Sequence, residues 1–186
     1  MTARLSMVAA LAAGIGFGPV LLAQKTTEVH PGRGGSPHVK TEYTIDGANV
    51  SITYGRPMLK GRSENDLMPP GKPWRTGADE VTRLTTDRTL TFGTIKLEPG
   101  TYTINTIPGD EWTLLIGRLA TPSEKRPVQW GIPYQQDLEI GRVPMTRSKT
   151  PSPVEQLTIT IEDTAKGGTL RIEWGAVRAE APFTVG

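Results

Sequence analysis

The chain contains no cysteine and only two histidines among its 186 residues. Without cysteine it has no disulfide, no thiolate metal ligand, no thiol nucleophile and no cysteine that could carry a lipid. Two histidines leave little room for a histidine-based metal site or a Ser-His-Asp triad, and His30 lies in a polar, turn-rich segment, which leaves His38. We therefore predict no metal site and no cofactor.

Long apolar runs are also scarce, since the only one extends from Leu5 to Ala23. A positive residue at Arg4, an apolar centre and a small residue at its end are typical of a secretion signal. We predict a signal peptide over residues 1–23, cut before Gln24, and export to the periplasm or the extracellular space. The alternative is an uncleaved anchor helix, but three glycines and a proline inside the run favour the signal. No second apolar run follows, so we expect no membrane span after cleavage.

Neither sign of charge dominates, because 21 basic residues face 19 acidic ones. Removal of Arg4 with the signal leaves a net charge of +1. A nearly balanced charge disfavours nucleic acid as a partner. A small molecule or a glycan remains a possible ligand, and the oligomeric state stays open.

The remaining chain has a pattern typical of short β-strands. Residues 24–37 carry almost no apolar side chains, which predicts a flexible leader. From Val39 onward apolar and polar residues alternate, and Asp46-Gly47 marks a hairpin turn. We predict a single domain over 38–186, an all-β, antiparallel β-sandwich that is either jelly-roll-like or an open barrel.

Two long irregular stretches, Gly55–Asp79 and Gly117–Arg147, interrupt the strand pattern. Long loops on a β scaffold are where binding residues gather. The first stretch is basic over residues 55–75 and is followed by an acidic region. One interpretation is a cleft in which arginines hold an anionic group and Trp74 forms a wall. The other is a set of structural ion pairs between the basic loop and Asp79 or Glu80.

The chain contains several short motifs. Taken together and in this order, they resemble those of an uncharacterised family of exported bacterial proteins, domain of unknown function 2911. The resemblance covers Ser36 to Phe183, and its longest block is Pro70-Gly71-Lys72-Pro73-Trp74-Arg75-Thr76-Gly77-Ala78-Asp79-Glu80. Other blocks are Ser36-Pro37-His38, Tyr54-Gly55-Arg56-Pro57, Leu97-Glu98-Pro99-Gly100-Thr101-Tyr102 and Leu170-Arg171-Ile172-Glu173-Trp174. The resemblance implies an exported β-rich domain whose signature lies on a loop, and it assigns no activity. The family pattern usually has Asn where this chain has Asp79.

Three functional hypotheses follow. The first is an exported binding module that holds a small anionic or polyhydroxyl ligand in a loop cleft lined by arginine and tryptophan. The second is a structural or interaction protein of the cell envelope, in which the loop around Trp74 and Arg75 is architectural. The third is a hydrolase or isomerase that uses Glu80 as general base. The candidate ligand-binding residues are His38, Tyr54, Arg56, Arg62, Trp74, Arg75, Asp79, Glu80, Trp130 and Tyr134.

Overall fold

The structure, a computed structural model, describes residues 25–120 and 134–186. The predicted signal peptide and Trp130 lie outside these residues. The strands are β1 (Lys25–His30), β2 (His38–Ile45), β3 (Ala48–Gly55), β4 (Thr82–Thr86), β5 (Leu90–Phe92), β6 (Ile95–Leu97), β7 (Gly100–Ile107), β8 (Trp112–Arg118), β9 (Glu139–Thr164) and β10 (Gly167–Val185). The helices in the described part are short: α1 (Glu64–Leu67) and the 3₁₀ turn η2 (Gln136–Leu138). No helix in these residues is long and apolar enough to cross a membrane.

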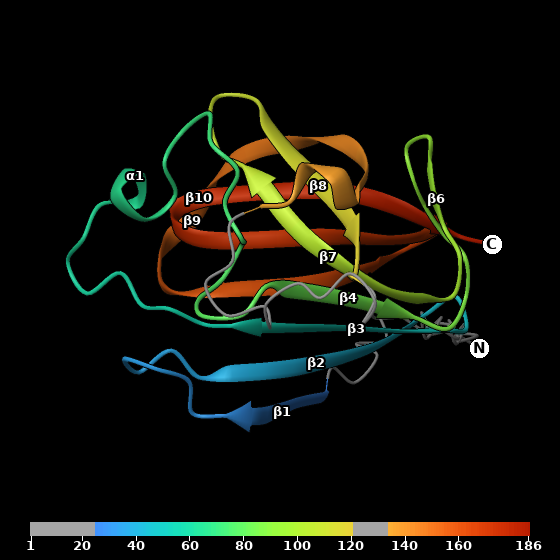
Figure 1. Ribbon diagram of the computed structural model, residues 1–186, viewed down its shortest axis with the longest axis horizontal. Coiled ribbons are helices and arrows are strands. Elements are labelled where there is room, and N and C mark those ends of the chain that lie inside the picture. Colours follow the sequence, from blue (N-terminus) through green and yellow to red (C-terminus); the bar gives the residue numbers. More distant parts are fainter. Residues whose placement is uncertain (1–24, 121–133) are drawn as a thin grey trace, which may run out of the picture.

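The described strands form one antiparallel sheet in the order β1-β2-β3-β4-β7-β8-β9-β10-β5-β6, which does not close into a barrel (Figure 1). The predicted all-β class is therefore confirmed. The sheet curls so that β3 meets β9, although the two strands are not neighbours in the sheet order. The Tyr54 hydroxyl on β3 accepts the Ile159 N–H of β9 at 2.9 Å, and Leu157 N–H donates to the Pro57 carbonyl at 2.9 Å.

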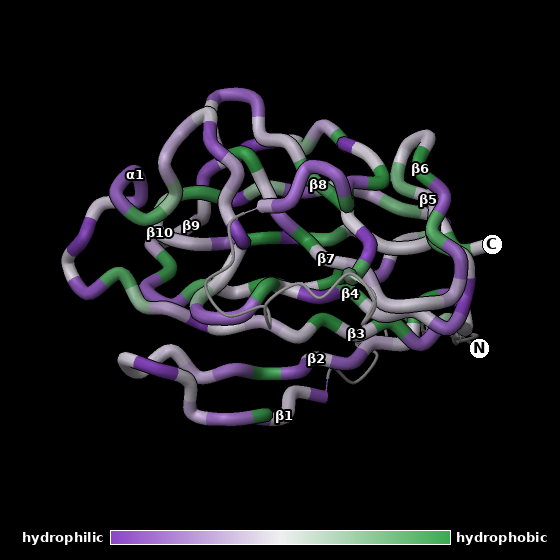
Figure 2. The backbone as a smooth tube through the Cα atoms, in the orientation of Figure 1, coloured by the Kyte–Doolittle hydropathy of each residue, from purple (hydrophilic) through white to green (hydrophobic). Residues whose placement is uncertain are grey.

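The alternation along the strands explains why one face of the sheet is buried. In β2 and β3 every second side chain is buried, and Figure 2 shows hydrophobic stretches interspersed with hydrophilic ones over the sheet. The predicted Asp46-Gly47 turn joins these two strands, with φ of 47° and 76° at its two residues. Two consecutive left-handed residues fit the tight hairpin turns that match strand twist. The buried side chains from both parts of the curled sheet form one hydrophobic core.

Two predicted boundaries were wrong. Residues 25–30, predicted within a flexible leader, form β1, which pairs with β2. An edge strand needs only backbone hydrogen bonds to one neighbour, so the exposed polar side chains of β1 gave no strand pattern. Residues 139–147, predicted within the second irregular stretch, belong to β9, because β8 offers backbone partners there. The first stretch, between β3 and β4, is irregular as predicted apart from α1.

Candidate functional site

The loop between α1 and β4 is tied to the core at Trp74 and Thr76. Trp74 pairs through its backbone with Thr106 of β7, and its ring stacks on Trp174 of β10 with centroids 5.8 Å apart. The buried Thr76 hydroxyl donates to the Trp74 carbonyl, and Thr82 donates to the Thr76 carbonyl at 2.8 Å. These contacts fix the path of the loop from Trp74 to the start of β4.

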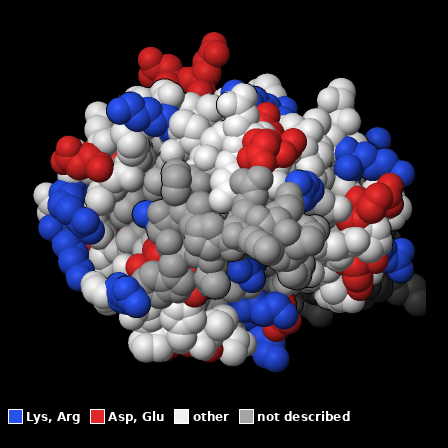
Figure 3. Space-filling view, in the orientation of Figure 1, with Lys and Arg blue, Asp and Glu red and all other residues white. Residues whose placement is uncertain are grey.

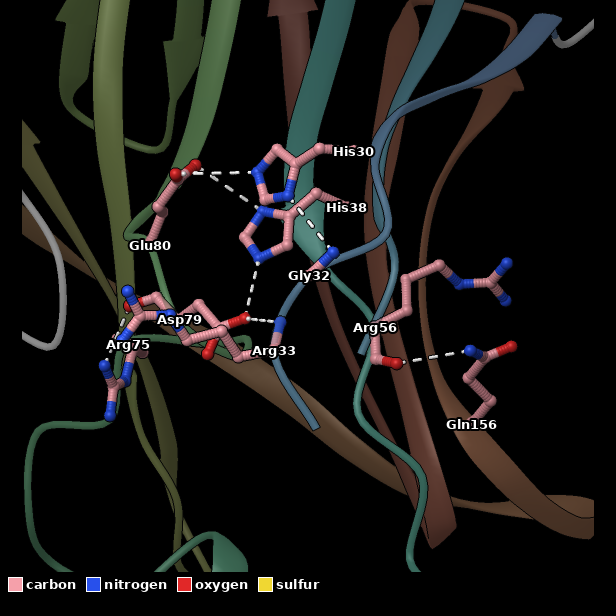
Figure 4. A network of polar contacts seen from close by, with 9 residues as sticks. All are labelled: His30, Gly32, Arg33, His38, Arg56, Arg75, Asp79, Glu80 and Gln156. Atoms are coloured by element: carbon pink, nitrogen blue, oxygen red, sulfur yellow. Dashed lines mark hydrogen bonds and ion pairs between the residues drawn. The ribbon is translucent and has the colours of Figure 1, made fainter. Parts of the chain in front are cut away.

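Two residues of this loop adopt a left-handed backbone without being glycine. Thr76 has φ of 58° and Asp79 has φ of 57°. A β-branched residue in this region is strained, and such conformations persist only where the surroundings hold them in place. The result of this path is that Asp79 and Glu80 extend toward the first residue of β2 (Figure 4).

Both histidines of the chain meet at the facing ends of β1 and β2. His30, the last residue of β1, pairs with His38, the first residue of β2, next to an irregularity in the strand register. Their rings stack with centroids 4.2 Å apart and planes 19° apart. The Gly32 N–H donates to His30 Nδ1 at 3.1 Å, which fixes the His30 ring from the loop side.

His38 lies between two carboxylates. Its side chain is 1% exposed, with Nε2 3.4 Å from Asp79 Oδ2 and Nδ1 3.5 Å from Glu80 Oε2. The other Glu80 oxygen, Oε1, lies 3.5 Å from His30 Nε2 (Figure 4). These separations are longer than those of ordinary hydrogen bonds, and His38 Nε2 is a buried nitrogen without a hydrogen-bond partner. We call His30, His38, Asp79 and Glu80 the histidine–carboxylate cluster.

A glycine makes room for this cluster. A Cβ at Gly55 would lie 2.6 Å from His38 Nε2 and 2.5 Å from the Ala78 carbonyl oxygen. Atoms do not approach that closely, so any larger residue at position 55 would displace either the imidazole or the loop. Gly55 at the end of β3 therefore allows His38 and the Asp79 loop to lie side by side.

The arginines of the predicted cleft do not converge on one ligand position. Arg75 donates through Nη1 to the Asp79 carbonyl at 2.9 Å and so stabilises the left-handed turn. Arg56 donates to the Leu157 carbonyl and the Thr158 hydroxyl of β9, and in Figure 4 its guanidinium points away from the histidines. Arg62 donates to the carbonyls of Met58 and Leu59 within its own turn.

The basic character of residues 56–75, which we call the arginine–tryptophan segment, is visible at the surface. Figure 3 shows Lys and Arg side chains, with an acidic group beside them, at the left-hand end of the molecule, the end where α1 lies in Figure 1. The guanidinium groups of Arg56 and Arg62 are nevertheless directed to backbone oxygens of the protein. Their contacts fit the structural interpretation of this segment better than the cleft.

The predicted aromatic residues also lie apart. Trp74 and Tyr54 are buried in the hydrophobic core, and burial raises the pKa of the Tyr54 hydroxyl. Tyr134 donates its hydroxyl to Glu139 at the start of β9. Of the nine predicted residues that the structure describes, it brings together His38, Asp79 and Glu80, with Arg75 bound to the Asp79 backbone (Figure 4).

Sequence reasoning missed His30. Its neighbours are polar and turn-forming, so their pattern predicts a position in the flexible leader and not in a site. The signal that could have identified it is its place eight residues before His38, with Pro31-Gly32 and Gly34-Gly35 between them. Such a spacing suits two short antiparallel strands joined by a turn, which would place both imidazoles at the same end of the pair.

Comparison with known proteins identifies the family but no activity. Residues 36–183 match the family described as a protein of unknown function (DUF2911). The chain belongs to this family. His38, Asp79 and Glu80 fall inside the region matched to the family, whereas His30 precedes it. No curated protein and no solved structure is detectably similar to the chain.

Proposed function

We propose that this member of the family is an exported binding module that holds a small ligand at the histidine–carboxylate cluster. The observation that carries the proposal is His38, a buried imidazole whose Nε2 has no hydrogen-bond partner although a carboxylate lies 3.4 Å away. A buried polar atom without a partner costs free energy, and a ligand or ion that fixes the His38 ring against Asp79 would restore the missing contact. Export rests on the signal-like pattern of residues 1–23.

The chemistry of the cluster favours some ligand classes over others. Carboxylates only accept hydrogen bonds and carry negative charge, and a neutral imidazole adds one donor and one acceptor. An anionic ligand would be repelled by Asp79 and Glu80, and the arginines expected to attract it are directed elsewhere. A cation, an amine or a polyhydroxyl compound fits the cluster better. This proposal keeps the binding module and the polyhydroxyl ligand of the sequence analysis, drops the anionic ligand, and limits the site to His38, Asp79 and Glu80 with His30 added.

A thermal-shift screen with divalent cations, small amines and sugars tests the proposal. A ligand that binds only the folded protein raises its melting temperature. Glu80→Gln should abolish the stabilisation, since it keeps the size of the side chain and removes its charge. Asp163→Asn, at an exposed position beside the β9–β10 turn, is the matched control and should keep it. If no compound stabilises the protein, or if Glu80→Gln responds like the control, the proposal is wrong.

An architectural role for the arginine–tryptophan segment is the second candidate. Trp74 stacks on Trp174 inside the core, and Arg75 binds the backbone of the loop. In this case the segment serves to hold the sheet together, and function resides on another surface. It predicts that variants of the cluster change no binding property, which the same screen measures.

A further inference from the structure

We infer that the histidine–carboxylate cluster is a site for a divalent transition-metal ion, with His30, His38 and Glu80 as ligands. The inference rests on the proposed function, because it names the ligand of that site. One nitrogen of each histidine and one oxygen of Glu80 lie within 4.8 Å of one another. The chain has only two histidines, and both contribute to this group. Strands β1 and β2 and the loop before β4 each supply one ligand.

The spacing of the donor atoms matches a shared ion better than hydrogen bonding. His38 Nδ1 lies 3.5 Å from Glu80 Oε2, and His30 Nε2, before its ring turns, lies 3.5 Å from the other oxygen, Oε1. Zinc binds nitrogen and oxygen at about 2.0–2.2 Å, so two ligands of a tetrahedral ion lie about 3.4 Å apart. An N–H···O hydrogen bond would bring the same atoms to about 2.7–3.2 Å.

Asp79 is placed to orient His38 rather than to bind the ion directly. When Nδ1 of His38 faces the Glu80 side of the cluster, Nε2 faces Asp79 Oδ2 at 3.4 Å. Histidines that bind metals commonly donate their second N–H to a carboxylate, which fixes the ring and makes it a better ligand. The Arg33 N–H holds the same Asp79 oxygen at 2.9 Å, so the carboxylate is itself held in place.

The donor set restricts the kind of ion. Two imidazoles and a carboxylate suit Zn²⁺, Cu²⁺ and Ni²⁺. Ca²⁺ and Mg²⁺ prefer sites made of oxygen atoms alone, so they should bind here weakly. Glu80 and His30 are each about one-third exposed, which leaves the ion a path from solvent to the buried His38.

Binding requires one ring to turn. Because an imidazole binds a metal in the plane of its ring, two rings stacked with planes only 19° apart cannot both aim at one ion. His38 is enclosed, whereas His30 is part-exposed at the end of an edge strand, so His30 is the ring that turns. Its turn breaks the hydrogen bond from the Gly32 N–H to Nδ1.

Calorimetric titration with Zn²⁺ alone tests the inference, on protein purified without a polyhistidine tag and stripped of metal. We expect one ion per chain. His30→Gln and Glu80→Gln should each weaken binding by more than about tenfold, the lower end of what even an outer-shell change costs. Both positions are part-exposed, so these two variants should fold normally. A change at the buried His38 would instead disturb the core. Asp163→Asn should bind like the wild type.

Nuclear magnetic resonance gives an independent measurement, because only two imidazoles contribute signals. Zn²⁺ should shift the ring resonances of both histidines and the amide resonance of Gly32. Absence of Zn²⁺, Cu²⁺ and Ni²⁺ binding overturns the inference, and so does binding that neither His30→Gln nor Glu80→Gln weakens. If an amine or a sugar then binds in a Glu80-dependent manner, the proposed function stands without the metal. If nothing binds, both fail.

Discussion

The arginine–tryptophan segment and the histidine–carboxylate cluster lie close together but satisfy their polar groups in opposite ways. In the segment, Arg62 donates to two backbone carbonyls at 2.8 and 2.9 Å, and Trp74 is packed in the core. In the cluster, four polar side chains approach one another at 3.4 to 3.5 Å, and a buried nitrogen has no partner. The contacts of the arginine–tryptophan segment are therefore made within the protein, whereas the histidine–carboxylate cluster beside it contains the unpaired nitrogen and is the candidate site.

Trp74→Ala should give the largest loss of stability. The variant removes a buried ring that stacks on Trp174 and leaves a cavity between the loop and β10. Such changes cost about 3–5 kcal/mol, which urea denaturation of the two proteins would measure. A loss below about 1 kcal/mol would show that the segment does not support the fold.

Gly55→Ala should have the next largest effect, and it should affect both regions. The added methyl group would lie 2.5 Å from the Ala78 carbonyl and 2.6 Å from His38 Nε2. Crowding of this kind costs about 1–3 kcal/mol, and here it also moves the carboxylates away from His38. We expect a lower melting temperature together with weaker ligand binding. Gly71→Ala is a useful comparison, because a Cβ there meets no atom within 4 Å and only its left-handed φ is strained.

Arg75→Ala should have a moderate effect. The variant removes the hydrogen bond that the guanidinium donates to the Asp79 carbonyl, and a bond to a charged donor contributes about 1.5–3 kcal/mol. Arg75 is part-exposed, so we expect a loss near the lower end and a melting temperature lower by several degrees. Differential scanning calorimetry measures the change. An unchanged melting temperature with lost ligand binding would instead place Arg75 in the site.

His30→Gln should have the smallest effect on stability and one of the largest on binding. The ring is part-exposed at the end of an edge strand, so its loss should cost about 0.5 kcal/mol or less. Urea denaturation and Zn²⁺ titration of the same preparation give both quantities. A destabilisation comparable to that of Trp74→Ala would remove the distinction between the two regions.

The parts of the fold that sequence could predict are those with a local cause. Alternation of apolar and polar residues predicts β2, β3 and the later strands, because one face of each strand is buried. Asp46-Gly47 predicts the hairpin between β2 and β3, because a left-handed turn favours these residue types. Strand β1 has no recognisable sequence pattern, because its stabilisation comes from backbone pairing with β2. No local sequence pattern indicates that strand β9 begins as early as Glu139, because that part of the strand is formed by pairing with β8.

The candidate site was predicted in part for a similar reason. His38 is a candidate because histidines are few, and Asp79 and Glu80 are candidates because they end the longest motif block. The roles of Trp74 and the arginines depend on partners far along the chain, such as Trp174 for Trp74 and Leu157 for Arg56. Residue type alone does not tell whether an arginine meets a ligand or a carbonyl oxygen of its own protein.

Strand β9 has a consequence for how the protein unfolds. Over residues 139–145 it pairs with β8, and farther along it pairs with β10 and meets the Tyr54 hydroxyl of β3. One continuous strand thus takes part in both sides of the curled sheet, and the two sides cannot separate without breaking the contact between β9 and β3. We expect a single cooperative transition, with amide hydrogens of β3, β8 and the middle of β9 exchanging only through global unfolding.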